Sequence, residues 1–339
     1  MASLRDVARL AGVSLATASR ALAQPERVGA ERRARVERAA DELGYHPRPR
    51  PQGPREAAPD LPIGVLVPDL QNPFFAGVAK GVQVQARTAG ISVVVADTDE
   101  DPRIEAEALT RLARQVCSLV LCSPRMSDQA LATLPGDVPT VLVNRESAHQ
   151  RAVLVDNADG VRQALAHLHA LGHRRIAYAG GPPASWSDGA RRHGLETAAA
   201  RDVEVVQLGH FPPVFAGGVA AADLVLVSGA TAVLAHNDLV ALGILDRLRQ
   251  RGVGVPDQVS VVGFDDIPAA THVTPALTTV AVPLQRLGRA AVDLLLETGG
   301  QAGAAPVTLP VALVVRSSSG PVAPVTSTIP GPPRTGAGA

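Results

Sequence analysis

The stretch of residues 6–20, D-V-A-R-L-A-G-V-S-L-A-T-A-S-R, constrains the fold more than any other part of the chain. Apolar residues recur at helical spacing at its start, at Val7, Ala8 and Ala11. Gly12 permits a sharp backbone turn, and Ser14 is a favourable N-cap for a second helix that ends near residue 22. The pattern predicts two short helices joined by a tight turn, a unit that can place one helix in the DNA major groove.

A third helix is predicted from about residue 30 to residue 43, with Gly44 as its stop. Its apolar face consists of Val36, Ala39, Ala40 and Leu43. On the second helix, the hydroxyl groups of Ser14, Thr17 and Ser19 suit phosphate contacts, which position a protein on DNA without reading its sequence.

Charge is distributed unevenly along the chain. Residues 1–55 contain 11 Arg and no Lys against 6 Asp and Glu, whereas the whole chain balances 32 basic against 32 acidic side chains. The head is therefore basic and the remainder acidic, which favours a nucleic-acid-binding arm on a larger body.

The head resembles the DNA-binding domain of the LacI/GalR (lactose-repressor) family. The matching text is L-R-D-V-A-R-L-A-G-V-S-L-A-T-A-S-R-A-L, then E-R-V-G, which contains Arg27, and then E-L-G-Y-H-P. The resemblance implies that Leu15, Ala16 and Arg20 read bases in double-stranded operator DNA, with Arg27 also in the DNA-binding set. Leu15 and Ala16 offer only apolar contact, for instance to thymine methyl groups, while Arg20 can bind guanine bidentately.

A proline-rich linker follows the head. Residues 47–62 contain six prolines, and the family's short hinge helix is hardly compatible with them because each proline removes a backbone donor. Two interpretations stay open: an extended arm in which Arg48 and Arg50 follow the minor groove or backbone, or a semi-rigid spacer.

From residue 61 onward, apolar runs alternate with helical stretches. The predicted strands are 63–67, 92–96, 118–122, 140–144, 176–180, 232–236 and 259–264, and the predicted helices include 74–89, 103–115, 159–171 and 238–251. Near-continuous apolar strands between helices predict two successive α/β lobes with buried, doubly wound parallel sheets.

The body also resembles the effector-binding core of the same family, which is similar to periplasmic sugar-binding proteins. The motifs include V-P-D-L-Q-N-P-F-F, V-D-N-A-D-G, V-S-V-V-G-F-D-D-I-P and L-V-V-R-S-S. The implied organisation is a helix-turn-helix head (residues 1–46), a linker (47–60), a core (61–319) and a Pro/Gly-rich tail (320–339) that we expect to be disordered. Within the core, we expect one lobe at 61–156 and 283–313 and the other at 157–282 and 314–319, with crossings near 155–157, 279–283 and 313–316.

Polar and aromatic side chains follow several predicted strands, where ligands bind in parallel sheets. The predicted effector-binding residues are Asp69, Asn72, Phe74, Asn144, Arg145, Arg191, Phe211, Asn237 and Asp265. Arg191, Asn237 and Asp265 are the strongest candidates. Asp238 is expected to cap a helix and Asp266 to be structural. Phe75 is either core or dimer packing, and Trp186 either lines the cleft mouth or covers a loop.

Several functional classes are disfavoured. No G-x-S-x-G elbow, P-loop or G-x-G-x-x-G motif after a strand indicates an enzyme. No His or Cys spacing predicts a metal site, and we expect no cofactor. Cys117 and Cys122 are expected to be reduced core residues. Without a signal-peptide pattern or an apolar run of about 20 residues, we expect a cytoplasmic protein that does not enter a membrane.

These features predict a homodimeric, effector-controlled transcriptional regulator, most consistent with a repressor, whose two heads bind half-sites of a pseudo-palindrome. The effector is expected to be a sugar or a related metabolite, acting either as inducer or as corepressor. An exported sugar-binding protein and an architectural DNA-binding protein are the alternatives. The DNA head argues against the first, and the predicted ligand cleft argues against the second.

Overall fold

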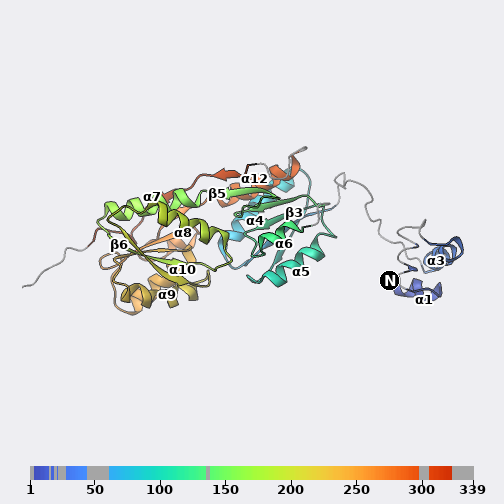
Figure 1. Cartoon of the computed structure of the whole chain (residues 1–339), viewed down its shortest axis with the longest axis horizontal. Helices are drawn as coiled ribbons and strands as arrows, with labels where there is room; N and C mark the ends of the chain where they lie inside the picture. Colours follow the sequence, from blue (N-terminus) through green and yellow to red (C-terminus); the bar gives the residue numbers. More distant parts are fainter. Residues whose placement is uncertain are drawn as a thin grey trace, which may run out of the picture. The chain divides into compact units, whose positions relative to one another are not determined.

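The computed structural model describes residues 4–14, 17–18, 21, 28–43, 61–134, 138–297 and 305–322. The chain divides into two compact units, Met1–Glu56 and Ala57–Ala339. The first unit is helical, and the second is built on two β-sheets (Figure 1).

The first unit has a small core of alanines and valines. Helix α1 (Leu4–Leu10) and helix α3 (Ala30–Glu42) enclose it together with a helical segment between them. The buried side chains are Val7, Ala8, Ala11, Ala18, Ala21, Val36, Ala39 and Ala40. This face is the one that the apolar spacing predicts.

The turn after α1 has the predicted geometry. Gly12 adopts a φ of 63°, a left-handed conformation that glycine enters without steric strain. The Val13 N–H donates to Ala8 O at 3.0 Å, and Ser14 Oγ accepts the Thr17 N–H at 3.1 Å. Ser14 therefore caps the second helix, and the predicted helix-turn-helix is confirmed.

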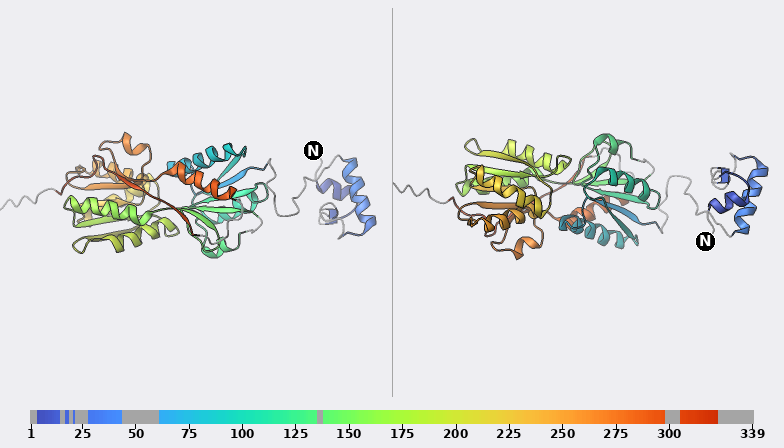
Figure 2. Two further views of the ribbon diagram at one scale, coloured as in Figure 1. Left: turned by 90° about the horizontal axis from the view of Figure 1, so that it is seen from above. Right: turned by 90° about the horizontal axis from the view of Figure 1, so that it is seen from below.

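The first lobe of the second unit contains a six-stranded, fully parallel sheet of order β2–β1–β3–β4–β5–β11. Its strands are β1 Ile63–Val67, β2 Val93–Asp97, β3 Ser118–Cys122, β4 Thr140–Val143, β5 Arg151–Val155 and β11 Val307–Leu309. Helices α4 (Pro73–Thr88) and α12 (Leu284–Leu296) cover one face, and α5 (Pro102–Leu112) and α6 (Asp128–Ala132) cover the other (Figures 1 and 2).

The second lobe repeats this architecture with the order β7–β6–β8–β9–β10–β12, in which only β12 is antiparallel. Its strands are β6 Arg175–Gly180, β7 Glu204–His210, β8 Ala232–Ala235, β9 Ser260–Asp265, β10 Thr278–Ala281 and β12 Ala312–Val314. Helices α7 (Asn157–Ala170) and α8 (Trp186–Ala198) pack on one face, and α9 (Phe215–Val227) and α10 (Asp238–Gln250) pack on the other. A short helix, α11 (Ala269–His272), follows β9.

The chain crosses between the lobes three times. It leaves the first sheet after β5 and returns to the first lobe after β10, where α12 packs on α4. The third crossing lies at residues 310–311, earlier than the expected 313–316. The reason is that β12 pairs with β10, with Leu313 opposite Val280, which draws residues 312 and 313 into the second lobe.

Side-chain caps hold the first turns of helices that follow strands. Asn72 Oδ1 accepts the Phe74 N–H at 3.0 Å, and Asn237 Oδ1 accepts the Val240 N–H at 2.9 Å. In parallel sheets these helix starts gather at the carboxyl edge of the strands. Caps and candidate ligand groups therefore occupy the same edge.

Helices α4 and α12 approach each other closely through glycines. A Cβ atom at Gly81 would lie 2.2 Å from Gln285 O, and one at Gly288 would lie 2.1 Å from Val78 O. Only glycine fits at these two positions.

Among the described residues, no helix combines the length and apolar character that crossing a membrane requires.

Candidate ligand-binding cleft

A small central cavity lies between the two lobes. Six of the nine predicted effector-binding residues line it, namely Asn72, Phe74, Asn144, Arg191, Asn237 and Asp265. Its volume is about 30 Å³, close to the space that one water molecule occupies in the liquid. The two walls are therefore closed onto each other's side chains.

An aromatic pair and an asparagine contribute to the first-lobe wall. Phe74 and Phe75 begin α4 and form an edge-to-face pair with ring centroids 5.1 Å apart. Both rings line the central cavity, so Phe75 belongs to the cleft as well as to the core. Asn144, directly after β4, has a φ of 56°, which asparagine tolerates better than most residues. Its Nδ2 donates to Ser123 Oγ at 3.1 Å.

Arg191 dominates the second-lobe wall. Its Nε donates to Asn157 Oδ1 at 2.9 Å, and its Nη1 donates to His236 O. The guanidinium lies 3.6 Å from the centroid of the Phe264 ring, and Nη2 lies 3.8 Å from Asp265 Oδ1. Three segments, namely α7, the residue after β8 and the end of β9, thus hold this planar cation in one orientation.

Two buried carboxylates, Asp265 and Asp238, lie near each other in the second lobe. Burial raises the pKa of Asp265 well above its ordinary value, although Arg191 opposes the shift. Asp238, the first residue of α10, accepts hydrogen bonds from the Thr279 hydroxyl at 2.5 Å and from the Ile267 N–H at 2.8 Å. Burial raises the pKa of Asp238 to about 7.

The expected role of Asp238 as a helix cap is wrong. Asn237 is the cap, because the side chain that precedes the first helical residue can reach the N–H groups of the first turn. The Asn237 amide also donates to Pro213 O at 2.9 Å, so both its ends are engaged. Asp266 accepts from Arg316 at 2.6 Å and has the structural role that we expected.

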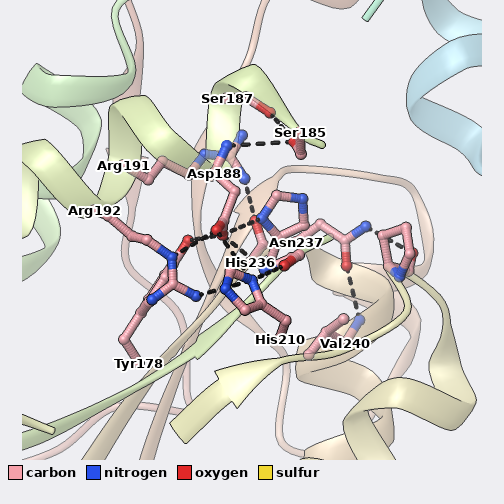
Figure 3. A network of polar contacts seen from close by, with 12 residues as sticks. Tyr178, Ser185, Ser187, Asp188, Arg191, Arg192, His210, His236, Asn237 and Val240 are labelled. Atoms are coloured by element: carbon pink, nitrogen blue, oxygen red, sulfur yellow. Dashed lines mark hydrogen bonds and ion pairs between the residues drawn. The ribbon is translucent and has the colours of Figure 1, made fainter. Parts of the chain in front are cut away.

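Asp188 organises a polar network that we did not predict (Figure 3). Its Oδ1 accepts the Tyr178 hydroxyl and the Gly181 N–H, each at 2.7 Å, and its Oδ2 accepts Arg192 Nε at 2.7 Å. His236 Nδ1 lies 3.2 Å from Oδ1, but the angles at this contact do not suit a hydrogen bond. The network ties β6, β8 and α8 together around Arg191.

The network sets two pKa values. Burial alone would raise the pKa of Asp188, but His236, Arg192 and the Gly181 N–H outweigh burial and hold it well below its ordinary value. Burial lowers the pKa of His236 to about 4, against the opposing effect of Asp188. At neutral pH the carboxylate is therefore ionised and the imidazole is neutral.

Sequence reasoning also missed Glu100, Ser123 and Arg125, which line the same cavity. Arg125 Nε and Nη2 donate to the two Glu100 carboxylate oxygens at 2.5 and 2.9 Å, and its Nη1 donates to Ser123 O at 3.0 Å. Ser123 and Arg125 follow directly after β3, so the same strand-end rule would have found them.

Three predicted residues do not line the central cavity. Asp69 accepts the Gln71 N–H at 2.7 Å in the turn before α4. Arg145 is buried and donates to Asp128 of α6 at 2.7 Å. Phe211 packs into the core of the second lobe.

Only two of the predicted DNA-contacting residues belong to the described part of the chain. Ser14 Oγ and Thr17 Oγ1 lie 2.8 Å apart at the start of the second helix. Leu15, Ala16, Ser19, Arg20, Arg27, Arg48 and Arg50 lie outside the described residues.

The fold and the cleft define a class. A helix-turn-helix head joined to a two-lobed core with a polar interlobe cavity is the architecture of a DNA-binding regulator. Residues 3–48 match the family of bacterial regulatory proteins of the lacI type, and residues 165–319 match the periplasmic binding protein-like domain.

The chain is also similar in sequence and structure to individual regulators of this class. The HTH-type transcriptional regulator GalS of Salmonella typhimurium is 35% identical over 91% of this chain and 92% of its own length. Two solved structures each cover 94% of this chain. A complex of the transcriptional regulator CelR with cellobiose has a TM-score of 0.68, 31% identity and 100% coverage of that chain. The lac repressor dimer bound to operator and the anti-inducer ONPF has a TM-score of 0.69, 29% identity and 99% coverage of that chain. The chain belongs to the lacI family of transcriptional regulators.

Proposed function

We propose that this protein is a cytoplasmic repressor that binds operator DNA as a homodimer, and that a small polyhydroxylated effector in the central cavity controls its affinity for DNA. The observation that carries the proposal is the chain of polar contacts across the cleft. Arg191 in the second lobe donates to Asn157 at the first crossing, and Asn157 Nδ2 lies 3.5 Å from Asn144 Oδ1 in the first lobe. A ligand bound here would contact both lobes and so favour one interlobe arrangement.

The charges in the cavity support an uncharged effector. Each arginine that faces the cavity has a carboxylate nearby, since Arg125 is paired with Glu100 and Arg191 lies beside Asp265. A phosphate ester would need cations that have no such partner. Planar hydrogen-bonding groups with an aromatic wall are instead suited to the hydroxyls and apolar ring faces of a sugar.

We propose that the cavity binds without catalysis. Ser123 Oγ accepts from Asn144, and Ser187 Oγ lies 3.0 Å from Ser185 Oγ. Among the described residues, neither hydroxyl has the histidine or carboxylate partner that would activate it as a nucleophile.

The test has two stages. A thermal-shift screen against neutral sugars, sugar phosphates and nucleosides should yield a neutral sugar, because a ligand that binds only the folded state stabilises it. Fluorescence anisotropy with operator DNA should then show a shift in affinity at saturating sugar, a linkage between two sites.

Variants connect the two stages. Asp265→Asn should abolish both the thermal shift and the change in DNA affinity while leaving effector-free DNA binding intact. The matched control Asp202→Asn changes an exposed carboxylate and should respond like the parent protein. A sugar that still shifts DNA affinity in Asp265→Asn would contradict the placement of the site.

A further inference from the structure

A second, larger cavity opens beside the central one. The outer groove is the cavity of about 780 Å³ lined by Arg125, Asp128 and Arg145 of the first lobe and by Ser185, Trp186 and His193 of the second. Arg125 also lines the central cavity, so the two spaces adjoin. Its volume lies within the range of about 300–1,000 Å³ that is typical of small-molecule sites.

The outer groove has an aromatic wall. Trp186, the only tryptophan of the chain, is the first residue of α8 and packs against the apolar cluster of the first lobe. The indole is half-buried, and its N–H donates to none of the described residues. The indole therefore offers an apolar face on which a ring-shaped ligand can stack, and an N–H that can donate a hydrogen bond to that ligand.

Polar groups stand opposite this ring. The Asp128 side chain is 84% exposed, and one of its oxygens accepts from Arg145 Nη2 at 2.7 Å, which leaves the other oxygen free for a ligand hydroxyl. Arg145 is itself buried and also donates to Pro124 O at 3.2 Å, so the pair is held in place. The His193 ring makes no hydrogen bond to the described residues.

We propose that the outer groove is a second subsite, which takes the second ring of an effector whose first ring occupies the central cavity. The inference rests on the proposed function and narrows the effector to an uncharged glycoside of at least two rings. The central cavity must widen to admit the first ring, whereas the outer groove is already open. The second ring would stack on Trp186, and its hydroxyl groups would donate hydrogen bonds to the free oxygen of Asp128.

Trp186 reports on its own groove because no other tryptophan contributes to the fluorescence. We would titrate the full-length protein with D-glucose, maltose and cellobiose, and with D-galactose, lactose and melibiose, following tryptophan emission and calorimetric affinity. At least one disaccharide should bind at least about tenfold more tightly than its monosaccharide and change the emission, since tenfold is what one good stacking contact contributes.

The variants separate stacking from folding. Trp186→Ala should weaken the disaccharide about tenfold and leave the monosaccharide unchanged, while Trp186→Phe should retain most of the affinity. Asp128→Asn should also weaken only the disaccharide. Phe215→Ala removes a partly exposed aromatic ring that lines neither cavity, so it serves as the control.

Two results would overturn the subsite. If monosaccharides and disaccharides bind equally, and Trp186→Ala changes neither, the outer groove is solvated surface and the central site alone stands. If no sugar of either length binds, the proposed effector class fails together with the subsite. Unchanged monosaccharide affinity in Trp186→Ala shows that the variant is folded.

Discussion

Removing the Asp188 carboxylate tests the network that holds Arg191. Tyr178 and Gly181 both donate to Oδ1 and are buried, so Asp188→Ala leaves two donors without a partner. Each such group costs about 1–3 kcal/mol. Losing the ion pair with Arg192 costs less than losing either hydrogen bond, because the Arg192 side chain is 22% exposed and solvent partly screens its charge. We expect Asp188→Ala to lower the free energy of unfolding by about 3–5 kcal/mol.

Asp188→Asn separates hydrogen bonding from charge. An amide oxygen at the Oδ1 position can still accept from Tyr178 and Gly181, while the amide nitrogen would face Arg192 Nε, another donor. We expect a loss of about 1–2 kcal/mol for this variant.

Urea unfolding of the full-length protein at pH 7 measures both losses of free energy. In a thermal scan, the Tm should fall by about 2–4 °C for each kcal/mol lost. Asp202→Asn, which alters an exposed carboxylate paired with Arg174, should change stability by less than about 0.5 kcal/mol. The reasoning is refuted if Asp188→Ala is no less stable than Asp188→Asn, because the two buried donors would then contribute nothing.

Three further predictions concern packing, pH and DNA. Gly81→Ala should lower the free energy of unfolding by about 1–3 kcal/mol, because the added Cβ would overlap the backbone of α12. Gly189→Ala is the control: no atom lies within 4 Å of its added Cβ, so urea unfolding should show an unchanged or higher stability. Burial lowers the pKa of His236 to about 4 in the folded protein, so the unfolded chain takes up a proton at a higher pH than the folded protein does. As the pH drops from about 6.5 to 4, the free energy of unfolding should therefore fall by about 3 kcal/mol more in the parent protein than in His236→Gln. Parallel curves of stability against pH for the two proteins would contradict this. If Arg48 and Arg50 contact phosphates, replacing both by Ala removes four such contacts from the homodimer, so operator binding should weaken and the slope of log affinity against log salt should become shallower by about 3.6. Unchanged affinity at fixed salt would favour the spacer interpretation.

Local chemistry sufficed for much of the architecture. The turn at Gly12 and the cap at Ser14 follow from residue types alone, because a sharp turn needs left-handed backbone and a helix start needs an acceptor. The valine-rich strands were predictable because both faces of a parallel strand are buried. Strands β7, β11 and β12 were not predicted, and they lie at sheet edges, where burial is incomplete and the apolar signal fades. The interior strands β5 and β10 were also not predicted, although they are largely buried.

The sequence by itself determined which residues come to the cleft edge, because side chains that follow parallel strands must gather there. It did not determine which way each side chain turns. Arg145 follows β4 directly after Asn144, yet it lines the outer groove and not the central cavity, because Asp128 of α6 accepts its hydrogen bond there. Asp188 becomes the centre of a network only when β6 brings Tyr178 and β8 brings His236 beside it. Only the tertiary structure decides such contacts, because they join residues that are distant in the chain and depend on how the strands are ordered in the sheet.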